Sequence, residues 1–370
     1  MKNNTPSKIL TILGAGILAV TLNACALLEP ATNPGAAGLA EATEDTNLTE
    51  APSAEQAAPI PPATGQIIFT SNRDGQSEFY VSSPDGAQVT RLTTNAAIDT
   101  SSSPRLSPDG TKIVFSSTIV DNTDLYILDM NSSFLQRITD APGRDSSPSW
   151  SPDGRQLAFE SFRDGNLEIY MVNADGSNLT RLTNDPAGDS NPVWSPVANE
   201  IVFTSNRFGN SDLMLVTTSG SVTTLTTSPN PDNAATWSPD GNFIAYHSAV
   251  GGDLEHIYLI GRDGLNATQL TSQAADYSQP VWSFDGQMLA ANNQKSILVF
   301  NRFTGEVTEL NQPGIEPRGT PAWSPDGLRL VFQAQAEGDM EIFYALTLTN
   351  EFTRLTFSPN YDGEPLWAVR

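Results

Sequence analysis

The stretch Pro148-Ser149-Trp150-Ser151-Pro152-Asp153-Gly154 decides the fold, because related copies of it return along the chain at a nearly constant interval. Each copy contains a marker residue, tryptophan in all but the first, at positions 106, 150, 194, 237, 282, 323 and 367. The markers are 44, 44, 43, 45, 41 and 44 residues apart. A self-similar period in the low forties indicates a β-propeller, whose blades are each too small to bury their own apolar face.

Each period contains four strand-like segments. The first ends at the marker and turns at Pro-Asp-Gly, where proline presets one backbone angle and glycine allows a positive one. In one period the other three are Leu157-Ala158-Phe159, Glu168-Ile169-Tyr170 and the alternating Leu179-Thr180-Arg181-Leu182-Thr183. Period-two alternation bounded by Gly, Pro, Asp and Ser predicts short antiparallel strands. We therefore expect an all-β propeller of four-stranded blades over residues 65–370.

The two ends of the array predict how the ring closes. The first unit opens at Gly65-Gln66-Ile67-Ile68-Phe69 and lacks a marker segment, whereas Pro365-Leu366-Trp367 is a marker segment with nothing after it. Joining the two removes two sheet edges that would otherwise template aggregation. Six complete units and this composite give seven blades closed by the C-terminal strand, with six or eight blades as the alternatives. The unit from Trp282 to Leu310 is the most degenerate, with a shortened hairpin.

The repeated motifs Trp-Ser-Pro-Asp-Gly, Ser-x-Arg-Asp-Gly-Asn, acidic-Ile-Tyr and Thr-Arg-Leu-Thr resemble the WD-like propeller repeat of the TolB family over about 306 of 370 residues. The resemblance implies the propeller fold. TolB itself has an α/β domain before its propeller, six blades and a soluble periplasmic location. This chain has a linker in that place, a predicted lipoprotein signal and seven units, so the resemblance does not imply the Tol–Pal role.

Residues 1–25 are predicted to be a lipoprotein signal peptide. Lys2 and Lys8 stand before or at the start of a 14-residue apolar run over residues 9–22, shorter than the roughly 20 residues of a spanning helix. Leu22-Asn23-Ala24-Cys25 follows and resembles a bacterial lipobox, in which the cysteine becomes the lipidated first residue. Cys25 is the single cysteine of the chain, which favours lipidation over the alternative of an ordinary secretory signal with an incidental cysteine.

Residues 26–64 are predicted to be a disordered tether. They are rich in Ala, Pro, Thr and Glu, with six acidic and no basic side chains, and cannot bury enough apolar surface to offset the entropy of ordering. The expected location is extracytoplasmic and lipid-anchored. In a Gram-negative cell, Ala26 after the cysteine resembles outer-membrane sorting with the protein facing the periplasm; otherwise we expect the cell surface.

The charge of the chain restricts its partners. Without the two lysines of the signal, 17 basic and 42 acidic side chains leave a net charge near −25. Such a charge argues against nucleic acid and anionic lipid headgroups, so we expect membrane contact through the lipid anchor alone. We predict a monomer that binds a protein partner, with a basic surface or peptide as its candidate feature. Solubility outside the cell is the alternative reason for the charge.

The candidate binding residues lie five positions before each marker, where the chain has Ser101, Asp145, Asp189, Asp232, Tyr277, Arg318 and Asp362. If the marker segment is the innermost strand, as the TolB resemblance implies, they lie at one mouth of the central channel. Loops between the second and third strands open on the same face and bring Arg73, Arg163 and Arg207 there. We predict that the four aspartates and three arginines form the binding face. The alternative is that each aspartate bonds backbone N–H groups of its own loop.

No catalytic residue, metal site or cofactor is predicted; a divalent cation in the channel is an alternative that we do not predict. His247 and His256 are the two histidines of the chain, too few for the histidine cluster of lyases on similar propellers. The chain also has no Gly-x-Ser-x-Gly elbow of a hydrolase. We therefore expect a membrane-tethered, non-enzymatic binding scaffold. The alternative is a glycan-active or other carboxylate-dependent enzyme that uses the acidic mouth.

Overall fold

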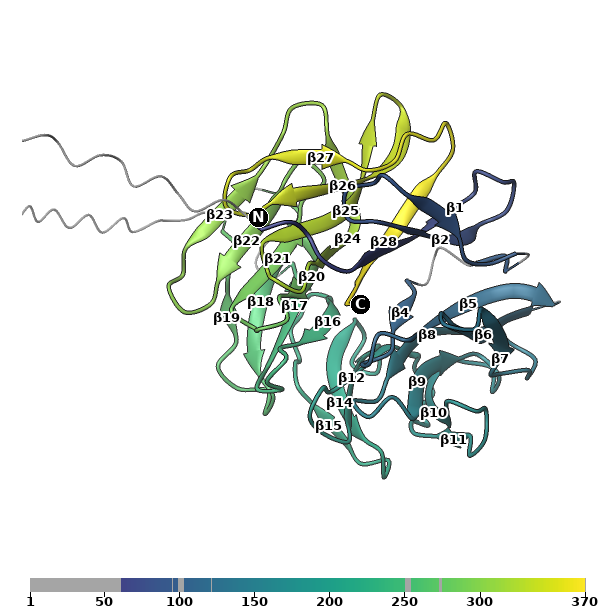
Figure 1. Ribbon diagram of the computed structural model, residues 1–370. Coiled ribbons are helices and arrows are strands. Elements are labelled where there is room, and N and C mark those ends of the chain that lie inside the picture. The colour runs from purple at the N-terminus through teal and green to yellow at the C-terminus, as the bar shows by residue number, and fades with distance from the viewer. Residues whose placement is uncertain are drawn as a thin grey trace, which may run out of the picture. The chain divides into compact units, whose positions relative to one another are not determined.

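A computed structural model describes residues 61–94, 96–98, 103–120, 122–249, 254–272 and 275–369, and these residues form strands and no helix (Figure 1). No helix long and apolar enough to cross a membrane is found in this part of the chain. The compact unit begins at Ile60. The predicted signal peptide, Cys25 and most of the predicted tether lie outside the described residues, so these remain predictions.

The strands form seven sheets of four antiparallel strands, which confirms the predicted seven-bladed propeller. Blade 1 contains β28 (Asp362–Ala368), β1 (Gln66–Ser71), β2 (Glu78–Ser82) and β3 (Val89–Arg91). Blade 2 contains β4 (Arg105–Leu106), β5 (Lys112–Val120), β6 (Asn122–Asp129) and β7 (Phe134–Arg137). Blade 3 contains β8 (Asp145–Trp150), β9 (Gln156–Ser161), β10 (Glu168–Asn173) and β11 (Thr180–Arg181). Blade 4 contains β12 (Asp189–Trp194), β13 (Glu200–Ser205), β14 (Asp212–Thr217) and β15 (Val222–Thr224).

The remaining three blades follow the same order. Blade 5 contains β16 (Asp232–Trp237), β17 (Phe243–Ser248), β18 (His256–Gly261) and β19 (Thr268–Gln269). Blade 6 contains β20 (Ser278–Trp282), β21 (Met288–Asn292), β22 (Ile297–Asn301) and β23 (Val307–Leu310). Blade 7 contains β24 (Glu316–Trp323), β25 (Arg329–Ala336), β26 (Asp339–Leu346) and β27 (Phe352–Arg354). The marker strand comes first in each blade, as predicted.

The closing blade is the predicted composite of the two chain ends. The C-terminal strand β28, yellow in Figure 1, lies beside the dark blue β1, and Trp367 is paired with Ile67. The indole N–H of Trp367 donates a hydrogen bond of 2.9 Å to the carbonyl of Thr64. The last residue of the predicted tether is therefore in contact with the propeller.

The core of the propeller lies between neighbouring blades. One buried cluster joins Val114 and Leu125 of blade 2 to Trp150, Leu157 and Phe159 of blade 3. The indole N–H groups of three marker tryptophans form hydrogen bonds across the interface with the preceding blade. Trp150, Trp237 and Trp323 each donate a hydrogen bond of 3.1 Å to a carbonyl of the innermost strand of the preceding blade. The recurring tryptophan is thus an architectural wedge that also satisfies its polar atom.

Six of the innermost strands contain a bulge upstream of the marker. In blade 3 the pairing shifts between Ser146 and Ser149, and Ser147 has a φ of 52°. In blade 7 the bulge is one residue longer, since the shift runs from Arg318 to Ala322. Arg318 therefore corresponds to Ser146, and Pro317 takes the place of Asp145. Counting five residues back from the marker misplaces Arg318 in blade 7.

Candidate functional site

The predicted arginine of blade 3 sits in a defined seat. Asp145 at the start of β8 is paired with Ser161 at the end of β9, so both side chains lie where Arg163 leaves the strand. The Nε of Arg163 donates to Oγ of Ser161 at 2.8 Å, and Nη2 donates to Oδ2 of Asp145 at 2.8 Å. The guanidinium carbon lies 5.7 Å from the ring centre of Phe159 and 4.8 Å from that of Tyr170. We call this set of a carboxylate, a serine hydroxyl and two rings the arginine seat.

Blade 1 contains the same seat, assembled by ring closure. Arg73 follows β1, whereas Asp362 begins β28 at the other end of the chain. Nη2 of Arg73 donates to Asp362 at 2.7 Å, and Nε donates to Ser71 at 2.9 Å. The guanidinium carbon lies 5.4 Å and 4.8 Å from the ring centres of Phe69 and Tyr80.

Blade 4 contains a third seat with one ring. Arg207 donates through Nη2 to both carboxylate oxygens of Asp189, at 2.8 Å and 3.1 Å, and through Nε to Ser205 at 2.9 Å. Its guanidinium carbon lies 5.9 Å from the ring centre of Phe203. The predicted arginines and three of the predicted aspartates are thus brought together as pairs within single blades.

Burial decides which partner of each pair faces solvent. The side chains of Asp145, Asp189 and Asp362 are 0% exposed, whereas those of Arg163, Arg207 and Arg73 are 12%, 18% and 24% exposed. Burial raises the pKa of Asp189 above its usual value. The aspartates bond arginine side chains, which the alternative of loop-backbone bonding did not include.

The fourth predicted aspartate has no arginine beside it. Asp232 begins β16, is paired with Ser248 at the end of β17, and is 1% exposed. Burial raises the pKa of its carboxyl group. Position 250, two residues after the serine, is Val250 rather than arginine. Blade 5 is therefore the exception among the blades that keep the aspartate.

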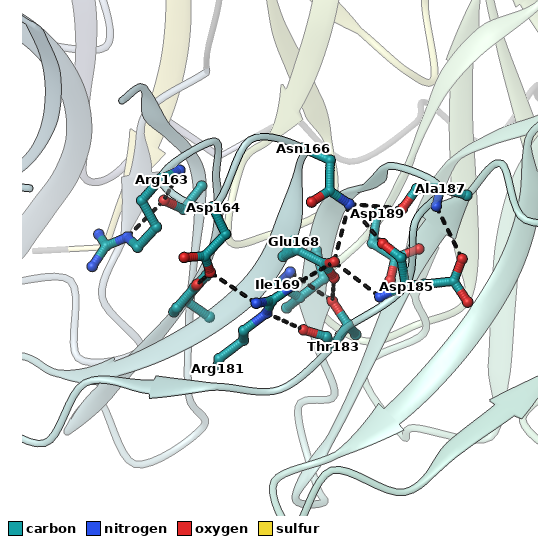
Figure 2. A network of polar contacts seen from close by, with 12 residues as sticks. Arg163, Asp164, Asn166, Glu168, Ile169, Arg181, Thr183, Asp185, Ala187 and Asp189 are labelled. Atoms are coloured by element: carbon teal, nitrogen blue, oxygen red, sulfur yellow. Dashed lines mark hydrogen bonds and ion pairs between the residues drawn. The ribbon is translucent and has the colours of Figure 1, made fainter. Parts of the chain in front are cut away.

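A second row of buried acids, not predicted as a site, begins the third strand of several blades. Glu168 is the example in Figure 2: Arg181 donates to its Oε1 at 2.8 Å and Thr183 to its Oε2 at 2.6 Å. Corresponding ion pairs join Glu78 to Arg91, Asp124 to Arg137 and Glu341 to Arg354. The acidic-Ile-Tyr and Thr-Arg-Leu-Thr motifs were the signal for these pairs, since their spacing is the same in each blade.

Exposed aromatic side chains, also missed from the sequence, lie on loops at the end of the blades where the seats are. Phe162 follows β9, Phe208 follows β13 and Phe357 follows β27, and they are 50%, 54% and 75% exposed. We call this end of the blades, with its arginines and exposed phenylalanines, the mouth. Large rings that stay exposed on loops are typical of binding surfaces.

The other titratable groups do not form a metal centre. Nδ1 of His247 lies 3.3 Å from Oε2 of Glu255, and burial lowers the pKa of the imidazole. Within the described ranges, no group of three or more His, Cys, Asp or Glu residues is arranged to hold a metal ion. A groove of about 550 Å³ lies between blades 4 and 5 at the end opposite the mouth, lined in part by Glu200 and Arg262.

Known sequences match parts of the chain. The family described as the TolB beta propeller domain matches residues 100–285 and 189–312. A protein TolB homolog of Chlorobium luteolum is 34% identical over 70 residues, which are 19% of this chain and 16% of that protein. The uncharacterized peptidase YuxL of Bacillus subtilis is 26% identical over 138 residues, 26% of this chain and 21% of that protein. The matches thus span about a fifth or less of each curated relative.

Solved structures share the propeller fold. TolB from Acinetobacter baumannii superposes with a TM-score of 0.55 at 22% identity, over 84% of this chain and 68% of that one. An oligogalacturonate lyase solved in complex with manganese superposes with a TM-score of 0.67 at 16% identity, over 77% of this chain and 86% of that one. The prediction of a non-enzymatic protein is wrong, because enzymes are found among these structures and one curated relative is named a peptidase.

Proposed function

Because the chain belongs to the family of the TolB beta propeller domain, we propose that it uses its rigid ring as a scaffold that binds a protein partner. In the proposal the mouth is the binding face and Cys25 carries a lipid that holds the protein at a membrane outside the cytoplasm. The partner offers a basic surface or peptide to the strongly acidic propeller. Fold alone does not carry this conclusion, so it rests on the contrast between the two ends of the blades.

The single observation that carries the proposal is that irregularity is concentrated at the mouth. At the opposite end, the serine hydroxyl of the Ser-x-Asp turn bonds the aspartate at 2.5–2.7 Å in blades 2, 3, 5, 6 and 7. At the mouth the arginine seat is complete in some blades and altered in others. Exposed phenylalanines occur at both ends of the blades and do not by themselves distinguish the two ends. Loops that vary on a rigid frame are where binding usually resides.

The mouth is tested by removing its exposed rings. We expect the double variant Phe162→Ser, Phe208→Ser to capture the partner from solubilised membranes about tenfold or more weakly, because buried aromatic anchors carry much of an interface's energy. Melting should stay close to wild type, since both rings are at least half exposed. The matched control is Phe284→Ser, Phe303→Ser at the opposite end, where the rings are 55% and 68% exposed. Equal loss in both variants, or none in either, would contradict the proposal.

The anchor is tested by cell fractionation. Cys25→Ser removes the thiol that a lipid requires, so we expect the protein to move from the membrane fraction to the soluble fraction. The control Ala26→Ser changes the next residue and keeps the cysteine, so it should stay with the membrane. If the Cys25 variant remains with the membrane, attachment does not depend on this residue.

A further inference from the structure

Blade 5 keeps the parts of an arginine seat but has no arginine of its own. Asp232 is paired with Ser248 as Asp145 is paired with Ser161 in blade 3. Arg163 stands two residues after its serine, and the chain has Val250 in the corresponding place. The carboxylate and the hydroxyl therefore remain where the cation has been lost from the sequence.

The two rings of the seat also remain. Tyr246 and Tyr258 stack with ring centres 5.6 Å apart and planes inclined by 28°. The corresponding pair in blade 3, Phe159 and Tyr170, has values of 5.8 Å and 31°, and in that blade the rings carry the guanidinium of Arg163. Ring faces attract cations, most strongly where water is excluded. Blade 5 thus preserves the geometry of a cation-binding ring pair.

The polar atoms that an arginine would contact are buried and unsatisfied. Oγ of Ser248 and Oδ2 of Asp232 have no hydrogen-bond partner of good geometry among the described residues, although Ser248 lies close enough to the carboxyl group to lower its pKa against the larger effect of burial. In blade 3 the equivalent atoms accept hydrogen bonds from Nε and Nη2 of Arg163. A buried polar atom left without a partner costs free energy, so a donor that reaches both atoms is favoured.

The neighbouring acid in blade 4 has lost its arginine as well. Asp212 takes the place of Glu168 and is 0% exposed, and neither of its oxygens has a hydrogen-bond partner of good geometry in the described part of the chain, although Thr226 and the backbone of Ser228 lie close enough to lower its pKa in part. Thr224, paired with Met214, takes the place of Arg181, which is paired with Tyr170. Burial and the nearby charge of Asp232 raise the pKa of Asp212.

The other interfaces that keep both acids also keep both arginines. Blades 2 and 3 meet at Asp124–Arg137 and Asp145–Arg163, blades 3 and 4 at Glu168–Arg181 and Asp189–Arg207, and blades 7 and 1 at Glu341–Arg354 and Asp362–Arg73. Between blades 4 and 5, two acids remain and neither arginine position is basic. This interface lacks the arginines that its counterparts supply from within the chain. The imidazole of His247 lies close enough to affect Asp232, but burial lowers its pKa and so favours its neutral form.

We propose that an arginine side chain of the protein partner occupies the seat formed by Asp232, Ser248, Tyr246 and Tyr258. The inference rests on the proposed binding function and names the group that the mouth recognises. A planar guanidinium can donate to the hydroxyl and the carboxylate together while stacking on the rings, which a compact ammonium or a metal ion cannot. Entry is from the mouth, because the seated arginines of blades 1, 3 and 4 are partly exposed there.

The test uses the full chain and two short probes. Acetyl-Gly-Arg-Gly-amide should bind saturably in calorimetry. The same peptide with citrulline, an uncharged isostere of arginine, should bind about tenfold or more weakly, because it lacks the charge that both acids attract. Equal heats from the two peptides would overturn the proposal. Calcium and magnesium chloride are titrated separately, and a competing effect of either ion on the arginine peptide would assign the seat to a metal instead.

Matched variants then locate the binding. Val250→Arg restores the arginine of blade 3 from within the chain, so it should raise the melting temperature and abolish peptide binding. Ala249→Arg adds the same charge one residue earlier and should bind the peptide as wild type does. Asp232→Asn, which keeps the side-chain volume, should weaken binding if Val250→Arg fails to fold. Undiminished binding in a folded Val250→Arg or Asp232→Asn variant would overturn the proposal.

The outcome is separable from that of the proposed function. If the Val250→Arg or Asp232→Asn variant loses peptide binding but still captures the partner, the arginine seat is refuted and the mouth remains the binding face. Loss of partner capture in the phenylalanine variants, with peptide binding unchanged, would support both. Peptide binding at the seat without any effect of the phenylalanine variants on capture would refute the mouth as the surface that holds the partner.

Discussion

At the scale of single residues, the structure of the mouth depends on the arginines that neutralise its buried carboxylates. Asp145 and Glu168 are 0% exposed, and each is bonded to an arginine from another part of its blade, Arg163 of the turn after β9 and Arg181 of β11. Removing one partner of a buried pair typically costs about 3–5 kcal/mol, since the remaining charge stays uncompensated. The arginines of complete seats are therefore structural first, and their outer edges are what a partner can contact.

Asp212, a buried acid with no arginine beside it, should make the free energy of unfolding depend on pH. Burial and the charge of Asp232 raise the pKa of Asp212 in the folded state, above the roughly 3.9 of an unfolded aspartate. Asp212 therefore does not reduce the free energy of unfolding below about pH 3.9, where its carboxyl group is protonated in both states. The free energy of unfolding falls as the pH rises through the folded pKa. We expect Asp212→Asn to melt about 2–4 °C above wild type at pH 7, with the gain shrinking toward pH 4.

The measurement compares melting curves of the two proteins across that pH range. Because His247 also titrates near Asp232, the difference between variant and wild type, rather than either curve alone, isolates Asp212. The control Asp175→Asn lies on an exposed turn, and hydrogen bonds from Ser177 lower the pKa of Asp175, so the opposite pH trend is expected there. A pH-independent gain for Asp212→Asn would contradict the assignment.

The sequence predicted which aspartates and arginines lie at the mouth, but not which aspartate bonds which arginine. Asp145 and Arg163 were placed on one face, but 18 residues separate them in sequence. The pairing follows only from the strand register, which sets Asp145 opposite Ser161 and leaves Arg163 two residues beyond. The fourth strands were expected to run through Thr183; β11 ends at Arg181 because the hydroxyl of Thr183 turns inward to accept the N–H of Ile169.

At the scale of elements, β28 is the piece on which closure depends. It pairs with β1 from Gln66 to Ser71 and supplies Asp362 to the seat of Arg73. Removing residues 364–370 would expose the edge of β1 and delete Trp367, which is 3% exposed. Losing a buried tryptophan alone costs about 3–5 kcal/mol, so the truncated chain should melt well below wild type or aggregate.

The matched control for this truncation is a deletion at the other end. Removing residues 26–59 should leave the melting temperature unchanged, because the compact unit begins at Ile60. Extending that deletion through residue 64 should lower it, since Ala63 packs against the buried cluster that contains Ile67 and Trp367. Equal melting temperatures for the C-terminal truncation and wild type would show that β28 does not hold the ring closed.

At the scale of the whole molecule, the blade number could be read from the sequence because each blade repeats the same wedge and turn. The intervals between markers did not show the longer bulge of blade 7. The shortened turn of blade 6, residues 293–296, precedes it, and the 41-residue interval combines the deletion with the insertion. Counting from Trp323 therefore misplaced Arg318, although the number of blades was correct.

The place where the chain enters the propeller also has a mechanical consequence. Residues 61–64 lead directly into β1, and β1 is bonded to β28 on one side and to β2 on the other. A pull on the N-terminal segment is thus directed along an interior strand rather than at a free edge. Two ladders of backbone hydrogen bonds then share the force in shear, instead of opening one bond at a time. The propeller should therefore resist a force applied through residues 61–64 without its strands separating one hydrogen bond at a time.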